Sequence, residues 1–132
     1  MPAKLDLIHL IRRAKPLTLK EGLKILERDQ YRCQYCGLDG MNNFENSLVM
    51  SVDFIVPRAH GGKKTPRNLV ACCRPCNLLK GRRNFSSFEE AKAYVLKRRE
   101  EVRQQWEARM ARLRAKAASA AGGAAQSAGE SQ

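Results

Sequence analysis

Cys33-Gln34-Tyr35-Cys36 and Cys73-Arg74-Pro75-Cys76 are two C-x-x-C pairs. Two residues between the cysteines of a pair let one turn of backbone present both sulfurs to the same ion. Four thiolates suit a closed tetrahedral Zn²⁺ site. The segment between the pairs is longer than in a simple zinc ribbon, so it must contain structure of its own. We therefore expect a structural zinc ion bound by Cys33, Cys36, Cys73 and Cys76.

Disulfides or buried free thiols are the alternative interpretation of these cysteines. The first ten residues contain Lys4 and Asp6 and no sustained apolar stretch, which does not resemble a secretory signal. We therefore expect a cytoplasmic, reducing location, which favours metal over disulfides. The fifth cysteine, Cys72, could replace Cys73 through a one-residue shift, but only Cys73 preserves the two-residue spacing. Cys72 is expected to be a small buried residue or a bystander.

The net charge of +12 favours a polyanionic partner, most often nucleic acid. No run of residues approaches the length and apolarity of a membrane span. Between Phe54 and Phe88 the chain has no Asp or Glu. A basic tract of this kind could serve solubility alone, but cations facing phosphates explain it better because each one releases condensed counterions. The residues expected to contact nucleic acid are Arg58, Lys63, Lys64, Arg67, Lys80, Arg82 and Arg83.

Local patterns predict both helices and strands, which is an α+β fold. Thr18 and Glu21 form a capping-box pattern for a helix over residues 17–29. Apolar and β-branched residues predict strands over residues 48–56 and 68–71. Aromatic residues are few, so the core must be small, which explains why a metal site would be needed to hold it together.

The second half of the chain is predicted to be helical. Pro75 suits the first turn of a helix that continues to about Arg82. A long helix follows, whose first half is expected to pack on the domain, while its second half projects or binds a partner, including a second copy of the chain. The expected organisation is an N-terminal extension (1–16), a zinc-bound domain (17–85), a long basic helix (86–116) and a disordered Ala/Gly/Ser-rich tail (117–132).

The segment from Tyr31 to Arg83 resembles an HNH endonuclease of the cysteine-rich, zinc-containing kind. The pattern of that family is C-x-x-C, then D-H-x-x-P and G-G, then N-L, then C-x-x-C-N-x-x-K-G. The resemblance covers less than half of the chain and implies a ββα-metal fold: two strands and a helix around one catalytic divalent ion, with a separate structural zinc. The matching residues, in the order of the family pattern, are Cys33/Cys36, Asp53, Pro57, Gly61/Gly62, Asn68/Leu69, Cys73/Cys76, Asn77, Lys80 and Gly81.

The chemistry of phosphodiester hydrolysis explains these residue types, because it needs charge neutralised on the phosphate and an activated water. Asp53 can supply a carboxylate oxygen and Asn77 an amide oxygen to Mg²⁺ or Mn²⁺. Lys80, three residues after Asn77 on the same helix face, is expected to touch a neighbouring phosphate. Asn68 resembles the family's middle asparagine, whose amide braces the loop backbone. Taken singly, Asp53 could instead cap a turn and Asn77 could be an ordinary polar helix residue.

Phe54 is the departure from the family pattern. The family has at this position the histidine that acts as general base, and phenylalanine cannot accept a proton. Loss of a general base typically slows a reaction by about 10²–10⁴-fold. His60 is close in sequence and is either a substitute base or a surface histidine that contacts phosphate.

Three functions remain open at the level of sequence. The first is a metal-dependent endonuclease, impaired at its base position, that acts on DNA rather than RNA. The second is a non-catalytic nucleic-acid-binding module on the same fold. The third is a zinc-bound interaction protein that uses its C-terminal helix. Asp53, Asn77 and Lys80 favour the first function, and Phe54 favours the second. The third would leave the acid-free basic tract without a purpose.

Overall fold

The computed structural model describes residues 16–130, with side chains described as far as residue 124. The predicted N-terminal extension, residues 1–16, lies outside the described residues except for Pro16. The chain divides after Lys97 into two compact units, which are described separately. The first unit holds the sheet, the short helices and the first turns of the long helix. Its elements are α2 (Leu19–Arg28), α3 (Phe44–Leu48), β1 (Met50–Phe54), the 3₁₀ turns η1 (Arg58–His60) and η2 (Pro66–Asn68), β2 (Leu69–Cys73), α4 (Arg74–Lys80) and the start of α5 (Phe88–Glu130).

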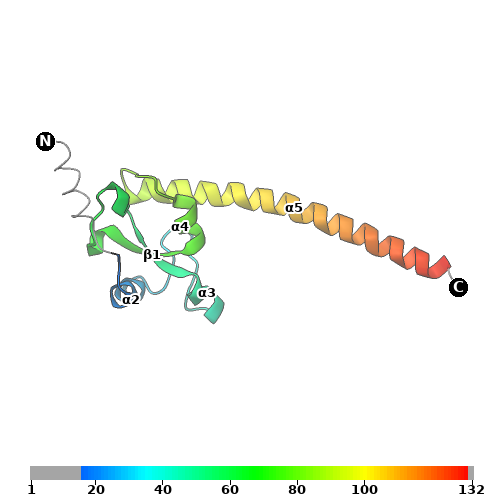
Figure 1. Cartoon of the computed structure of the whole chain (residues 1–132), viewed down its shortest axis with the longest axis horizontal. Coiled ribbons are helices and arrows are strands. Elements are labelled where there is room, and N and C mark those ends of the chain that lie inside the picture. The colour runs from blue at the N-terminus through cyan, green and yellow to red at the C-terminus, as the bar shows by residue number, and fades with distance from the viewer. Residues whose placement is uncertain (1–15, 131–132) are drawn as a thin grey trace. The chain divides into compact units, whose positions relative to one another are not determined.

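A two-stranded antiparallel sheet lies at the centre of the first unit. Met50 pairs with Cys73 at one end of the ladder, and Phe54 pairs with Leu69 at the other. Figure 1 shows α2, α3 and α4 gathered around these strands. The mixed fold predicted from the sequence is confirmed: helices, a two-stranded sheet and a long C-terminal helix.

Helix α2 spans Leu19–Arg28, inside the predicted range of 17–29, and has the predicted capping residues. The Thr18 hydroxyl accepts the Glu21 amide at 3.2 Å, and the Glu21 carboxylate accepts the Thr18 amide at 3.3 Å, which completes the capping box. The strand predicted over residues 48–56 is shorter than expected. Its first part belongs to α3, because the Asn43 side chain caps that helix by accepting the Asn46 amide at 2.8 Å.

The core is small, as expected from the few aromatic residues. Its buried members come from the first C-x-x-C pair, both strands, α4 and the first turns of α5: Cys33, Tyr35, Met50, Ala71, Cys72, Cys73, Cys76, Ala91 and Val95. Tyr35 packs on Phe88 with ring centroids 5.2 Å apart. The long helix therefore completes the core with its N-terminal turns, as predicted for its first half.

The prediction of a disordered tail over residues 117–132 differs from the structure, in which α5 continues through Glu130. Alanine is the strongest helix former, and this segment is rich in it. Gly122 and Gly123 each cost a helix about 1 kcal/mol relative to alanine, which the surrounding alanines tolerate. None of the helices within residues 16–130 combines the length and apolar character needed to cross a bilayer.

Candidate functional site: a four-cysteine cluster and a buried Asp53 centre

The four predicted cysteine ligands are brought together. The sulfurs of Cys33, Cys36, Cys73 and Cys76 all lie within 4.8 Å of one another. The Cys36 and Cys73 sulfurs are 3.7 Å apart. Tetrahedral Zn–S bonds of about 2.3 Å place sulfurs about 3.8 Å apart, so the cluster fits such an ion and could hold a metal.

Local backbone geometry explains why these sulfurs converge. Gly37 has φ of 80°, and its amide donates to the Cys33 carbonyl at 2.9 Å, which closes the first turn. Cys73 is the N-cap residue of α4, and Pro75 occupies the first turn of that helix, as predicted. Hydrogen bonds among the four thiols lower the pKa of Cys33 and raise the pKa of Cys73 and Cys76. The remaining thiols would therefore have to release their protons when an ion binds.

Cys72 lies outside the cluster and is fully buried, as predicted. Its sulfur contacts the Ser51 hydroxyl at 3.4 Å. Burial raises the pKa of the Cys72 thiol to about 12. It therefore behaves as a small, protonated core residue.

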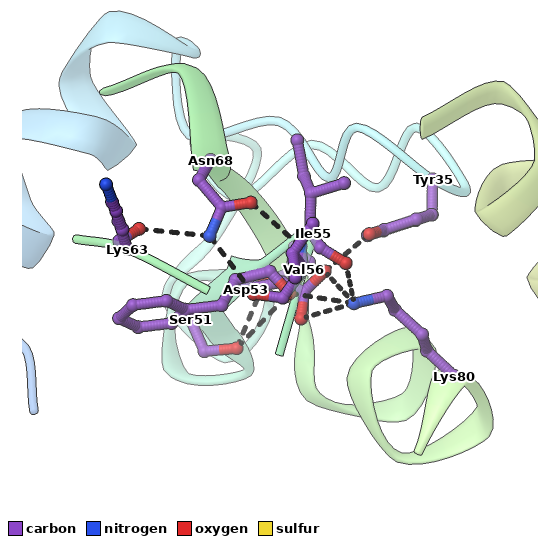
Figure 2. A network of polar contacts seen from close by, with 10 residues as sticks. Tyr35, Ser51, Asp53, Ile55, Val56, Lys63, Asn68 and Lys80 are labelled. Atoms are coloured by element: carbon purple, nitrogen blue, oxygen red, sulfur yellow. Dashed lines mark hydrogen bonds and ion pairs between the residues drawn. The ribbon is translucent and has the colours of Figure 1, made fainter. Parts of the chain in front are cut away.

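Asp53 is the second notable group, because it is a carboxylate in the interior. It is only 6% exposed. The Tyr35 hydroxyl donates to its Oδ2, and the Lys80 ammonium lies 3.2 Å from Oδ1 and 3.0 Å from Oδ2. Figure 2 shows the Tyr35 and Lys80 side chains both pointing at Asp53. Burial raises the pKa of the Asp53 carboxyl, and the contacts with Tyr35 and Lys80 oppose that rise.

Lys80, which the sequence predicts to touch a phosphate, is held by acceptors inside the protein. Its Nζ also donates to the Phe54 carbonyl at 2.8 Å and the Ile55 carbonyl at 3.0 Å, and the residue is 1% exposed. The ammonium is therefore not available to a phosphate in this arrangement. The sequence placed Lys80 correctly on α4, but its acceptors belong to the end of β1 and the residue after it, which only the fold brings near.

Asn77 is half-buried on α4, one turn before Lys80 and on the same face of the helix. Asp53 and Asn77 supply a carboxylate and an amide oxygen, which is the donor class that Mg²⁺ and Mn²⁺ take. The Lys80 ammonium already marks a place for positive charge against Asp53. The residues thus fit a divalent ion in their chemistry, provided that the ammonium gives way.

Phe54 lies at the end of β1 and is half-buried. Because side chains alternate along a strand, it leaves the sheet on the face opposite to Asp53. The Arg58 guanidinium lies over the Phe54 ring, 6.0 Å from its centroid. Position 54 therefore borders the basic loop, residues 58–67.

His60 is exposed on η1, and its Nε2 lies 2.9 Å from the Arg82 carbonyl. This contact joins the basic loop to the end of α4. It directs the imidazole toward the backbone at Arg82, and His60 as a substitute base stays a prediction.

Asn68 holds the basic loop in shape. Its amide oxygen accepts the Val56 amide at 2.8 Å, and its amide nitrogen donates to the Val56 and Lys63 carbonyls, each at 3.0 Å. Figure 2 shows this bridge between the two sides of the loop. A Cβ atom on Gly62 would lie 1.7 Å from the Val56 carbonyl oxygen, so only glycine fits there.

The predicted phosphate-contacting cations are placed unequally. Lys64 is half-buried, and its ammonium pairs with Glu21 at 2.8 Å. Arg83 is exposed, with its guanidinium 4.8 Å from the centroid of the Tyr94 ring. Arg58 is half-buried at the Phe54 ring. The remaining members are exposed: Lys63, Arg67 and Arg82.

Sequence reasoning missed three residues that position these groups. Tyr35 was read only as a spacer inside C-x-x-C, and nothing local indicates its contact with Asp53. Arg28 donates to the Pro66 carbonyl at 2.9 Å and to the Leu69 carbonyl at 2.6 Å, and Asp29 accepts the Ala71 amide at 2.8 Å. These two residues tie the end of α2 to the loop and to β2. The only sequence signal for Arg28 and Asp29 is that two opposite charges stand side by side at the end of α2.

Comparison with known proteins agrees with this geometry. Residues 33–83 match the family model of the HNH endonuclease. A stretch of 62 residues, 46% of this chain, is 42% identical to the CRISPR-associated endonuclease Cas9 of Corynebacterium diphtheriae. The chain spans only 5% of the length of that relative. No solved structure matches. Residues 33–83, which contain both the cysteine cluster and the Asp53 centre, form a domain of the HNH endonuclease family.

Proposed function

We propose that this chain binds DNA through the basic surface of its HNH domain and hydrolyses phosphodiester bonds slowly with a divalent ion. The observation that carries the proposal is that Asp53 and Asn77 both lie within the HNH match, on β1 and α4, with Asp53 directly before the acid-free basic tract and Asn77 inside it. That tract supplies exposed cations at Lys63, Arg67 and Arg82. Zinc, held by the four cysteines, has a structural role in this proposal.

Each residue would perform a definable task. Asp53 and Asn77 would hold Mg²⁺ or Mn²⁺, which supplies charge neutralisation at the phosphate and an acidified water. Asn68 keeps the loop from Val56 to Lys63 in one conformation, so that its cations face the substrate together. Phe54 accepts no proton, and the ring of His60 is directed at the Arg82 carbonyl. Hydrolysis without a general base is expected to be slower by about 10²–10⁴-fold than in a domain that has one.

A nicking assay on supercoiled plasmid with Mg²⁺ or Mn²⁺ tests this function. Wild-type protein should convert supercoiled plasmid to open circles over hours, and Asp53→Ala should not. The variant also controls for contaminating nuclease. His60→Ala is expected to retain nicking, because the imidazole of His60 is directed at the Arg82 carbonyl. Equal nicking by wild type and Asp53→Ala, with both proteins folded, would reject hydrolysis at this centre.

Binding without cleavage is the second candidate function. Phe54 at the base position and the Lys80 ammonium on Asp53 both favour it. Salt-dependent DNA binding by wild type, with no nicking above the Asp53→Ala background, would select this function. Absence of both nicking and salt-dependent binding would reject both candidates and leave an interaction protein.

A further inference from the structure

We infer that the Lys80 ammonium is an internal cation that competes with a divalent ion for the Asp53 carboxylate. On this inference, metal binding at Asp53 requires displacement of Lys80, and displacement frees a cation for the phosphate of the substrate. The inference rests on the proposed function, because it concerns how the same centre is regulated.

The contacts of Lys80 motivate this inference. Its Nζ lies 3.0 Å from Asp53 Oδ2, 2.8 Å from the Phe54 carbonyl and 3.0 Å from the Ile55 carbonyl. An ammonium has three donors, so these oxygens fill its hydrogen-bonding capacity. A carboxylate with carbonyl oxygens is also the ligand class of hard divalent cations. The lysine therefore occupies a position that is chemically suited to a metal ion.

Two cations cannot share this position at low energetic cost. Asp53 is 6% exposed and Lys80 1% exposed, so water screens their neighbourhood weakly. The Tyr35 hydroxyl already donates to Asp53 Oδ2, which holds the carboxylate in its present orientation. A divalent ion approaching Asp53 would meet the ammonium of Lys80 at close range. Because the two cations repel each other, either the Lys80 ammonium or a divalent ion can neutralise the Asp53 carboxylate, but not both at once.

The released side chain has a use on the same helix face. Lysine carries its charge on a flexible four-carbon stem, and Asn77 lies one turn before Lys80. An ammonium that leaves Asp53 can therefore reach a phosphate next to an ion held by Asp53 and Asn77. Metal binding and phosphate binding would then be coupled through one lysine.

Direct Mn²⁺ titration of the zinc-loaded full chain, followed by electron paramagnetic resonance, tests the competition. Lys80→Gln should bind Mn²⁺ about 10–100-fold more tightly than wild type. This factor corresponds to the free energy of one hydrogen bond to a charged group, which the metal no longer has to break. Lys64→Gln is the matched control. It also removes a paired ammonium, but the partner of Lys64 is Glu21, at 2.8 Å, and not Asp53. Its Mn²⁺ affinity should equal that of wild type. Adding Asp53→Asn to Lys80→Gln should abolish the gain.

Equal Mn²⁺ affinity in folded wild type and Lys80→Gln overturns the inference. If Lys80→Gln does not fold, wild-type protein labelled with ¹⁵N-lysine decides the question. A buried, hydrogen-bonded ammonium exchanges its protons slowly, so Lys80 should give a resolved NMR signal that disappears as Mg²⁺ is added. Persistence of the signal throughout the titration overturns the inference.

The two proposals fail separately. Tighter Mn²⁺ binding by Lys80→Gln, together with no plasmid nicking by wild type above the Asp53→Ala background, supports the competition and rejects the nuclease function. Nicking by wild type that depends on Asp53, with Mn²⁺ affinity unchanged in Lys80→Gln, supports the nuclease function and rejects the competition.

Discussion

The cysteine cluster and the Asp53 centre lie at opposite ends of one ladder and balance their charge in opposite ways. Cys73 pairs with Met50 at one end, and Asp53 pairs with Val70 near the other. The cluster consists of four thiols that face one another, so as thiolates they repel unless a cation joins them. Asp53 faces an ammonium supplied by α4. We therefore expect the fold to require an external ion at the cysteine cluster and not to require one at Asp53.

Loss of the cluster should have the largest effect. Cys73→Ser removes one of four ligands from segments that are distant in sequence. Structural zinc contributes about 10–16 kcal/mol of binding free energy in small domains, more than the stability of most domains of this size. We expect the variant to lose zinc and cooperative unfolding, as measured by metal analysis and circular dichroism.

The matched control for that variant is Cys72→Ala, at the neighbouring buried cysteine outside the cluster. It should keep one zinc ion per chain and unfold cooperatively at a lower temperature. Wild-type protein that is free of zinc, yet unfolds at an unchanged temperature, would contradict the contrast between the two sites.

The second prediction concerns the position beside Asp53. Phe54→His should raise plasmid nicking by up to about 10²-fold, because it restores a proton acceptor at the border of the basic loop. The Asp53→Ala change should remove this gain. If Phe54→His is folded but nicks no faster, then the side chain at position 54, on the opposite sheet face from Asp53, does not reach the reacting water.

A smaller effect is expected on the salt dependence of DNA binding. It should differ between two adjacent lysines, because only one of them is paired with a carboxylate. Lys63 is exposed, whereas the Lys64 ammonium lies 2.8 Å from Glu21. Lys63→Gln should flatten the slope of log affinity for DNA against log salt by about one unit. Lys64→Gln should change the slope less, since its charge already has an internal partner. Equal changes in fluorescence-anisotropy titrations would show that the Lys64–Glu21 pair opens when DNA binds.

The smallest effect is expected from the same ion pair in acid. The Lys64 ammonium and the Thr18 hydroxyl lower the pKa of Glu21 from 4.5 to about 2. A depressed carboxyl pKa stabilises the folded state above pH 4.5, and this stabilisation is lost as the pH falls toward 2. The difference in melting temperature between wild type and Glu21→Gln should therefore shrink below pH 4.5. Zinc release in acid should lower the melting temperature of both proteins equally, so it does not affect their difference. A difference that does not change with pH would contradict the lowered pKa of Glu21.

Local sequence was sufficient for features whose partners lie close along the chain. The capping box of α2 depends on Thr18 and Glu21, three residues apart, and the structure confirms it. The C-x-x-C spacing within each pair predicts converging sulfurs, because one turn of backbone sets their separation. Composition favours a disordered tail over residues 117–132, whereas helix propensity favours a helix there because alanine is a strong helix former, and α5 continues through Glu130.

For the Asp53 centre, the sequence predicted most of the residues but not the contacts between them. Asp53, Asn77 and Lys80 were identified from their spacing and their resemblance to the HNH pattern. Tyr35 was not identified, although its hydroxyl donates to Asp53 from inside a C-x-x-C pair. Contacts between residues this far apart in sequence depend on the packing of separate elements, which local patterns do not contain.

The sequence alone determined the four cysteines, the family pattern, the basic tract and the substitution at Phe54, because these are properties of residue type and spacing. The tertiary structure decided where the charges go. It placed Lys80 against Asp53 and two carbonyls at the end of β1 and just beyond it. It also placed Lys64 against Glu21, and His60 against the Arg82 carbonyl. Each of these contacts joins elements that are separated in the chain, and burial decides which charges remain available to a ligand. The physical reason is that a charge is balanced by its neighbours in space.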